Sequence, residues 1–283
     1  MERIVSQQRD VRSWWTGTWR IVLLAAFTSM LVQPTMAAAG EEDYPDRFSL
    51  RLGGYRVQDA DTIIRNDSNN APVGMYIDFH DTLGGETSAT VLRADGLYRF
   101  NDRHALGFAW YNIKFNGSAD MGKDISWGDI PITQSTHVDS ELKFDVVKLN
   151  YQYSLFHNEK AELGAVAGLH IMKLSIELNT ASQSYTEAIT APLPVFGVFA
   201  NYHFDPRFSV FYNYQFFFIN YDNRVKGGLQ DMLLGLEYRL TKHVALGGAF
   251  NHFAFNIENT KENNTVSASG GWNSGMLYAA VYF

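Results

Sequence analysis

The chain has 283 residues, of which 46% are hydrophobic, 19% are charged and none is cysteine. The absence of thiols excludes a disulfide framework, cysteine-ligated metal centres, thiol nucleophiles and a lipidated N-terminal cysteine. A formal charge of -7, with 20 Phe and 15 Tyr, argues against disorder and a nucleic-acid partner. The mean hydropathy of -0.18 requires dispersed apolar residues, which excludes a bundle of membrane helices.

One apolar run stands near the start of the chain, at 21–32. It is shorter than the roughly 20 residues that a membrane-spanning helix needs. Four arginines precede it, and Ala37 and Ala39 supply small residues before Gly40, a pattern typical of a secretory signal peptide. We therefore predict a signal peptide over 1–39, cleaved after Ala39, and a linker over 40–47. An uncleaved anchor is the alternative, because two acidic residues lie before the apolar run.

From Phe48 to Phe283 the chain alternates between apolar and polar residues, in segments of about ten residues separated by turn chemistry. One such segment places Val147, Leu149, Tyr151, Tyr153 and Leu155 between Lys148, Asn150, Gln152 and Ser154. Its length is that of a tilted strand crossing a membrane. The pattern predicts an all-β domain over 48–283.

A water-soluble sandwich would show the same alternation, so three further features are needed to favour a membrane barrel. Aromatic residues cluster at strand ends, where a girdle would meet lipid headgroups: Tyr151, Tyr153, Tyr202, Phe204, Tyr238, Tyr278 and Tyr282. Short connections alternate with long ones at about 119–139, 179–191 and 258–273. The final segment of the given sequence has the pattern of a strand, and its last residue, Phe283, is aromatic. These features predict a closed, antiparallel, up-and-down transmembrane β-barrel.

The final strand carries a resemblance to a known family. Apolar residues alternate along it, and Tyr278, Val281, Tyr282 and Phe283 end it. It resembles the C-terminal strand of bacterial outer-membrane β-barrel proteins, which their assembly machinery reads. The resemblance covers 48–283. It implies a monomer in the bacterial outer membrane, surrounded by outer-membrane lipids and lipopolysaccharide, and inserted by the barrel-assembly machinery with periplasmic chaperones. It names no single activity.

The strand number follows from parity, because a barrel with both termini in the periplasm needs an even count. Nine segments are evident after residue 88, and segments at 48–57 and 73–82 precede them. Counting the weak segment 62–66 as a short strand gives twelve. Ten and fourteen strands are the alternatives.

Projecting the alternation inward collects charged residues of both signs. The predicted lumen-lining residues are Arg51, Asp78, His80, Arg93, Asp95, Arg99, Lys148, Glu162, His170, Asp231, Glu237 and Arg239. Interior charges must be paired or hydrated, since isolated burial costs several kcal/mol or more. We favour an ion-pair network filling a narrow barrel, then a passive pore whose selectivity the charges tune, then a bound polar ligand. The expected function is that of a passive pore or a structural envelope protein, with no cofactor.

An outer-membrane enzyme, such as a lipase or lipid A deacylase, is the competing class, and a surface adhesin or receptor is a third. His137 and Ser140, beside Asp139 and Glu141, form a close grouping of the residue types that acyl transfer needs. Three residues apart on a strand, however, His137 and Ser140 point to opposite faces. The sequence therefore predicts no catalytic residues, and the loop at 119–139 is expected to pack on its neighbours.

Overall fold

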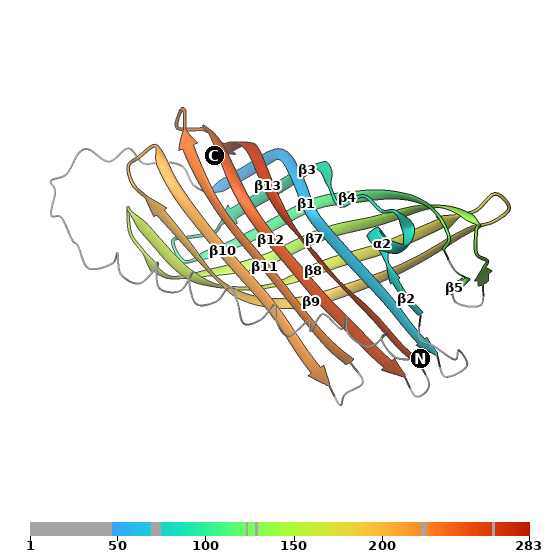
Figure 1. Ribbon diagram of the computed structural model, residues 1–283. Helices are drawn as coiled ribbons and strands as arrows, with labels where there is room; N and C mark the ends of the chain where they lie inside the picture. The colour runs from blue at the N-terminus through green and yellow to red at the C-terminus, as the bar shows by residue number, and fades with distance from the viewer. Residues whose placement is uncertain (1–46, 69–74, 123, 128–129, 222–224, 262–263) are drawn as a thin grey trace, which may run out of the picture. The chain divides into compact units, whose positions relative to one another are not determined.

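The structure is a computed structural model that describes residues 47–68, 75–122, 124–127, 130–221, 225–261 and 264–283 (Figure 1). The predicted signal peptide, its cleavage site and nearly all of the linker lie outside the described residues. Within the described ranges, no helix combines the length and the apolarity needed to cross a membrane.

Ten antiparallel strands close into a barrel, as the all-β prediction requires. They are β1 (Phe48–Ser68), β3 (Ala89–Arg99), β4 (His104–Asp120), β7 (His137–His157), β8 (Ala161–Asn179), β9 (Ser184–His203), β10 (Phe208–Tyr221), β11 (Val225–Arg239), β12 (Val244–Lys261) and β13 (Asn264–Tyr282). The last strand pairs with the first, and Phe48 and Phe283 exchange two backbone hydrogen bonds of 2.8 and 2.9 Å.

The remaining elements are short. β2 (Met75–Asp78) pairs with the outer part of β1 and leads directly into α2 (Phe79–Leu83). β5 (Ile125–Trp127) and β6 (Ile130–Ile132) form a separate hairpin. Met121, which precedes this hairpin, and Ile132, which ends it, are buried in the apolar core, as expected of a loop that packs on its neighbours.

The observed strand number is one of the two alternatives, and the preferred count of twelve is wrong. The weak segment at 62–66 is the outer part of the 21-residue strand β1. A register shift between Gln58 and Asp61, with a φ of 52° at Asp59, interrupts the alternation there. Such a bulge makes one long strand look like two in sequence. The segment at 73–82 contributes β2 and α2 in place of a full strand.

The barrel has two unlike ends. The "turn end" carries Phe48, Phe283 and four short turns, and each turn is closed by a polar side chain that accepts two backbone N–H hydrogen bonds. These side chains are Asn101, Asn158, Asp205 and Thr241. The "loop end" carries the long hairpins. In the outer-membrane orientation predicted from sequence, the turn end is periplasmic.

Each long strand changes its polarity pattern halfway along, as β7 shows. Near the turn end, Lys148, Asn150 and Ser154 are buried inside, while Val147, Leu149 and Leu155 are exposed outside. Near the loop end the inward residues other than Ser140 are apolar, namely Val138, Leu142, Phe144 and Val146. The outward residues there are His137, Asp139, Glu141, Lys143 and Asp145, so the two faces exchange character between residues 146 and 147.

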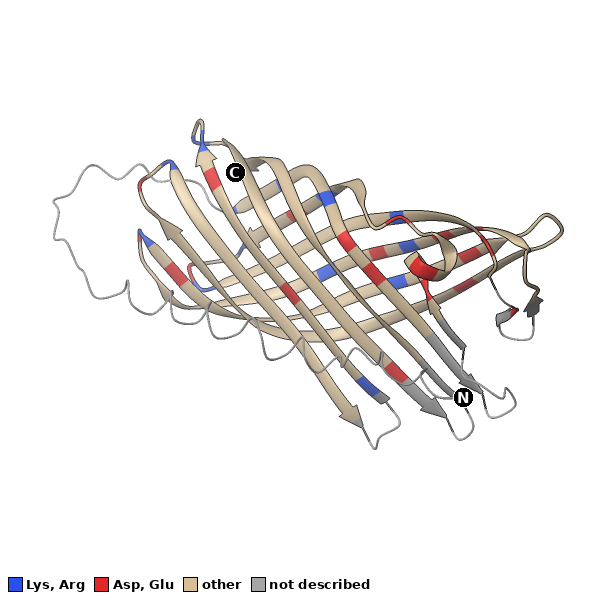
Figure 2. Ribbon diagram, in the orientation of Figure 1, with Lys and Arg blue, Asp and Glu red and all other residues tan. Residues whose placement is uncertain are grey.

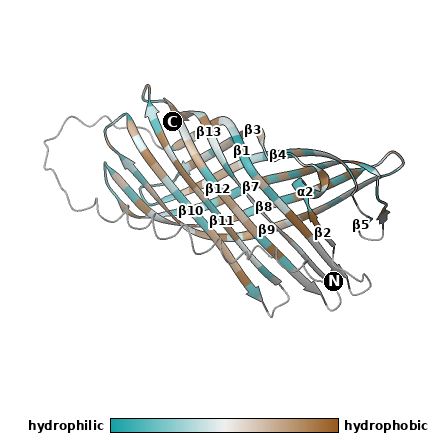
Figure 3. Ribbon diagram, in the orientation of Figure 1, coloured by the Kyte–Doolittle hydropathy of each residue, from teal (hydrophilic) through white to brown (hydrophobic). Residues whose placement is uncertain are grey.

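The neighbouring strands change in the same way. On β4 the outward apolar residues end at Trp110 and Lys114 follows; on β8 they end at Ile171 and Lys173 follows. Figure 2 shows charged positions along these strands, and Figure 3 shows that hydrophobic and hydrophilic residues are interspersed along them. The "turn half" of the barrel is thus built for an apolar exterior, and the "loop half" for an aqueous exterior with an apolar core.

The core of the loop half is tightly packed aromatic and aliphatic side chains. The Phe144 ring lies 5.3 Å from the Trp272 ring and 6.0 Å from that of Phe255, between ring centroids. Phe253 stacks on Trp272 at 4.4 Å. All four residues are at most 5% exposed. The loop half therefore has the interior of a water-soluble β-protein.

Hydrogen bonding between the described strands is incomplete in the loop half. β9 pairs with β8 over its whole length, but with β10 only from Phe196 to His203. Pro192 and Pro194 lie just beyond this point and have no N–H to donate to a further strand. The described strands here thus form two facing sheets, β4 with β7–β9 and β10–β13 with β1, which diverge in Figure 1.

Candidate functional site: a charged chamber inside the turn half

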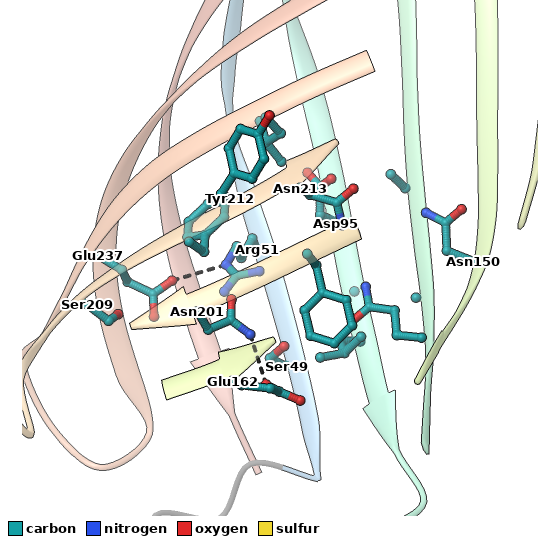
Figure 4. Close-up of a pocket in the computed structure, with 18 of the residues that line it drawn as sticks. Ser49, Arg51, Asp95, Asn150, Glu162, Asn201, Ser209, Tyr212, Asn213 and Glu237 are labelled. Carbon is teal, nitrogen blue, oxygen red and sulfur yellow. Dashed lines mark hydrogen bonds and ion pairs between the residues drawn. The ribbon is translucent and has the colours of Figure 1, made fainter. Parts of the chain in front are cut away.

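The interior of the turn half contains a cavity of about 180 Å³. Its charged lining consists of Arg51, Arg93, Arg99, Lys148 and Arg239 against Asp95, Glu162, Asp231 and Glu237. Figure 4 shows polar side chains from several strands, including Asn150, Asn201 and Asn213, around the same space. We call this cavity the "chamber". The numbers of basic and acidic side chains are nearly equal, which matches the interior of mixed charge expected from the sequence.

One ion pair lies toward the turn end of the chamber. Arg51 Nε donates to Glu237 Oε2 at 3.0 Å (Figure 4), and the Tyr278 hydroxyl donates to the same oxygen at 3.2 Å. The Tyr282 hydroxyl donates to the other carboxylate oxygen. The Arg51 guanidinium also lies 4.7 Å from the centroid of the Phe211 ring. Glu237 is therefore held by three donors from two strands, β1 and β13.

A second ion pair is bidentate. Arg99 donates through Nη1 and Nη2 to the two Glu162 oxygens, at 2.9 and 3.0 Å. Asn201 donates to the same carboxylate at 2.9 Å, and Ser154 donates through its hydroxyl. Planar guanidinium–carboxylate pairs of this kind fix geometry as well as charge. The Arg99–Glu162 pair therefore fixes the positions of these side chains in the part of the chamber nearest the turn end.

The chamber is bounded toward the loop end by a largely buried network, which we call the "ceiling". Lys148 Nζ pairs with Asp231 Oδ2, and Asn251 donates to Asp231 Oδ1 at 2.7 Å. Arg93 donates to the Asp95 carboxylate at 2.8 and 2.9 Å. Arg93, Lys148 and Asp231 are only 2–4% exposed.

Aromatic side chains complete the ceiling. The Arg93 guanidinium lies 5.1 Å from the Tyr55 ring centroid and 5.2 Å from that of Tyr111. Tyr55 donates to Asn251 at 2.5 Å and accepts from Trp272 Nε1 at 3.0 Å. Because Trp272 also belongs to the apolar core, the ceiling and the core are continuous. Among the described residues, two successive layers of buried side chains, one ion-paired and one apolar, thus lie between the chamber and the loop end.

Most of the predicted lumen-lining residues do face the interior. Arg51, Arg93, Asp95, Arg99, Lys148, Glu162, Asp231, Glu237 and Arg239 line the chamber, and His170, which is fully buried, pairs with Gln215 beside it. Asp78 and His80 do not, and the prediction is wrong for them. The strand ends at Asp78, which caps α2 by accepting the Asp81 N–H at 2.8 Å. His80 is exposed on α2, with Nδ1 2.7 Å from the Gly85 carbonyl oxygen.

The aromatic girdle was predicted correctly only in part. Tyr151, Tyr202, Phe204 and Tyr238 are 40–56% exposed on the outer wall, as expected. Tyr278 and Tyr282 instead point inward to Glu237, because the alternation of β13 places them on the inner face. Val281 and the 61% exposed Phe283 stay outside. The role of these four residues in assembly remains a prediction.

Sequence reasoning missed the neutral partners that hold the charges. Asn251 joins Asp231, Tyr55 and the Met232 carbonyl, yet it stands among apolar and small residues on β12. The alternation along β12 places Asn251 on the inward face, and this was the feature of the sequence that could have identified it. Among the described residues, no group of three acidic or histidine side chains is placed to hold a metal ion.

The grouping around His137 is also rearranged. Ser140 is 5% exposed, points inward, and its hydroxyl has no hydrogen-bond partner among the described residues. His137 contacts Ser118 and Asp120 on the adjacent strand instead. Opposite faces therefore separate His137 from Ser140, as the strand geometry predicts.

Comparisons with known proteins give a fold and no family. No family model and no curated protein matches the sequence. The outer-membrane protease OmpT from Escherichia coli is similar in structure, with a TM-score of 0.54 at 9% identity, covering 84% of this chain and 97% of that one. The translocator domain of the autotransporter NalP from Neisseria meningitidis scores 0.46 at 10% identity, covering 85% and 90%. OprG, an outer-membrane protein from Pseudomonas aeruginosa, scores 0.38 at 14% identity, covering 85% and 97%.

Proposed function

Starting from the fold of an integral outer-membrane β-barrel, we propose that this protein is a closed, structural barrel of the outer membrane and not an open passive pore. The ceiling is the observation that carries the proposal. A passive pore needs a continuous aqueous path, whereas Arg93, Lys148 and Asp231 are buried, paired and backed by the apolar core. Opening the path would separate buried charges, which costs several kcal/mol for each.

The length of the strands supports a structural role. Transmembrane strands need about 9–11 residues, whereas β7, β8 and β9 have 21, 19 and 20. Because the outward apolar residues cover only the turn half of β7, we infer that the loop half stands in water beyond the lipid. The barrel would then act as a rigid support that holds the loop end away from the bilayer.

Planar-bilayer recording tests this function. The refolded full chain should give no discrete conductance steps, because the ceiling and the core block the interior. Protease protection of the turn half in the same preparation must first show that the barrel is inserted, so that silence is informative. Discrete steps from the wild-type chain that change in size in Arg93→Ala would establish a pore and overturn the proposal.

We further propose that the turn end faces the periplasm and the loop end faces the cell exterior. The absence of cysteine allows a direct test with single introduced thiols. Ala181 and Glu159 are both exposed, at the loop end and the turn end respectively. A membrane-impermeant maleimide on intact cells should label Ala181→Cys and leave Glu159→Cys unlabelled until the cells are lysed. The reverse pattern would invert the orientation.

A further inference from the structure

The outer wall of the loop half brings three chemically complementary side chains together. In the register of β4 and β7, Asp120 pairs with His137, and Ser118 pairs with Asp139. Residues two apart on a strand share a face, so Ser118 and Asp120 both point outward beside His137. Ser118, Asp120 and His137 are all exposed, which leaves them open to a molecule in solution.

The contacts of His137 have the order that acyl transfer needs. His137 Nδ1 lies 2.7 Å from Asp120 Oδ1, and its Nε2 lies 3.2 Å from Ser118 Oγ. A carboxylate on one ring nitrogen and a hydroxyl on the other define a nucleophile, a general base and a group that orients the base. We propose that Ser118, His137 and Asp120 form a hydrolytic site for carboxylic esters on the outer wall of the barrel.

The reaction uses only an ester and water. Ser118 Oγ attacks the ester carbonyl carbon while His137 Nε2 takes the hydroxyl proton, and His137 returns that proton to the departing alkoxide. Water then attacks the acyl-Ser118 ester, again giving its proton to His137, and the carboxylic acid leaves with Ser118 restored. Asn116 lies two residues before Ser118 on the same face of β4. One N–H of its amide donates to Glu86 Oε2 at 3.3 Å, and the other is the candidate donor to the oxyanion.

The position of the site defines its substrate class. Trp110 is the last outward apolar residue on β4, and at about 3.3 Å per residue Ser118 lies roughly 25 Å further along the strand. The ester must therefore arrive from water and not from the acyl chains of the bilayer. Asp139 Oδ1 lies 3.6 Å from His137 Nε2, and this second carboxylate disfavours anionic molecules. The site fits neutral or cationic, water-accessible esters.

Active-site labelling of the full, refolded chain tests the proposal. A fluorophosphonate probe should label the wild type on Ser118, and the chain should hydrolyse p-nitrophenyl acetate. Ser118→Ala should lose both properties, and His137→Ala should lower the rate by about 100-fold or more. Ser182→Ala, which removes an exposed hydroxyl in the loop between β8 and β9, is the matched control and should behave as the wild type.

The pH profile separates a positioning role of Asp120 from a structural one. The charged groups that face His137 are Asp120 and Asp139, and the hydrogen bond to Asp120 raises the pKa of His137 above its ordinary value. Because only neutral imidazole acts as a base, the rate should rise with pH through that pKa. Asp120→Asn should move this limb to lower pH. An unlabelled wild type, labelling that survives Ser118→Ala, or an unmoved limb in Asp120→Asn would each overturn the proposal.

Discussion

Asp231→Ala is expected to destabilise the barrel by about 3–5 kcal/mol, because it leaves a buried charge without its partner. Lys148 and Asp231 are 3% and 4% exposed, and Asn251 also donates to the same carboxylate. Removing that carboxylate therefore strands an ammonium group and an amide inside the ceiling. The free energy of unfolding by urea in detergent micelles, followed by tryptophan fluorescence, measures the loss.

Two variants make this result specific. Lys148→Met combined with Asp231→Leu removes both charges and should be much less destabilising than Asp231→Ala alone. Lys226 and Glu258 form a 3.4 Å pair whose side chains are 45% and 41% exposed, so Glu258→Ala should cost no more than about 1 kcal/mol. If Asp231→Ala costs no more than Glu258→Ala, the ceiling is not a buried ion-pair network.

Phe144→Ala is expected to cost about 3–5 kcal/mol, the range for removing a fully buried aromatic side chain. Phe144 is 0% exposed and contacts Phe115, Phe255 and Trp272 by their rings. The cavity would lie next to Trp272, so its fluorescence and the near-ultraviolet circular dichroism should change together with stability.

Ser175→Ala is the matched control for the core. Ser175 pairs with Lys143 across β7 and β8, at nearly the same depth as Phe144 but on the outward face. This substitution should alter stability by no more than about 0.5 kcal/mol. Equal losses at Phe144 and Ser175 would mean that the loop half is not packed as a core.

Alternation predicted much of the fold, because a period of two assigns every residue of a strand to one of two faces. The closed barrel, the short turns and the inward positions of Lys148, Glu162 and Glu237 all follow from that rule. Alternation does not say which face of a strand is buried, or whether the exposed face contacts lipid or water. The exchange of polarity at 146–147 on β7 keeps the same period, so the apolar core of the loop half was not foreseen.

The features that were not predicted depended on the pairing register between strands, which a single sequence does not specify. Ser118 and His137 meet because Asp120 pairs with His137 across β4 and β7, although a long loop separates the two strands in sequence. The bulge near Asp59 divided β1 into two apparent segments and produced the wrong strand count. In both cases a local pattern was clear, and the non-local pairing decided its meaning.

The exchange of polarity along the strands also creates a barrier to entry into the membrane. The outward face of β7 near the loop end carries five ionisable side chains, from His137 to Asp145. If the turn end remains in the periplasm, all of them must travel across the hydrocarbon before they reach water. A Lys on the lipid face costs about 2–4 kcal/mol at the bilayer midplane, and several strands make this passage together. Spontaneous insertion should therefore be slow, and a helper that shields the travelling loop half from acyl chains should accelerate it.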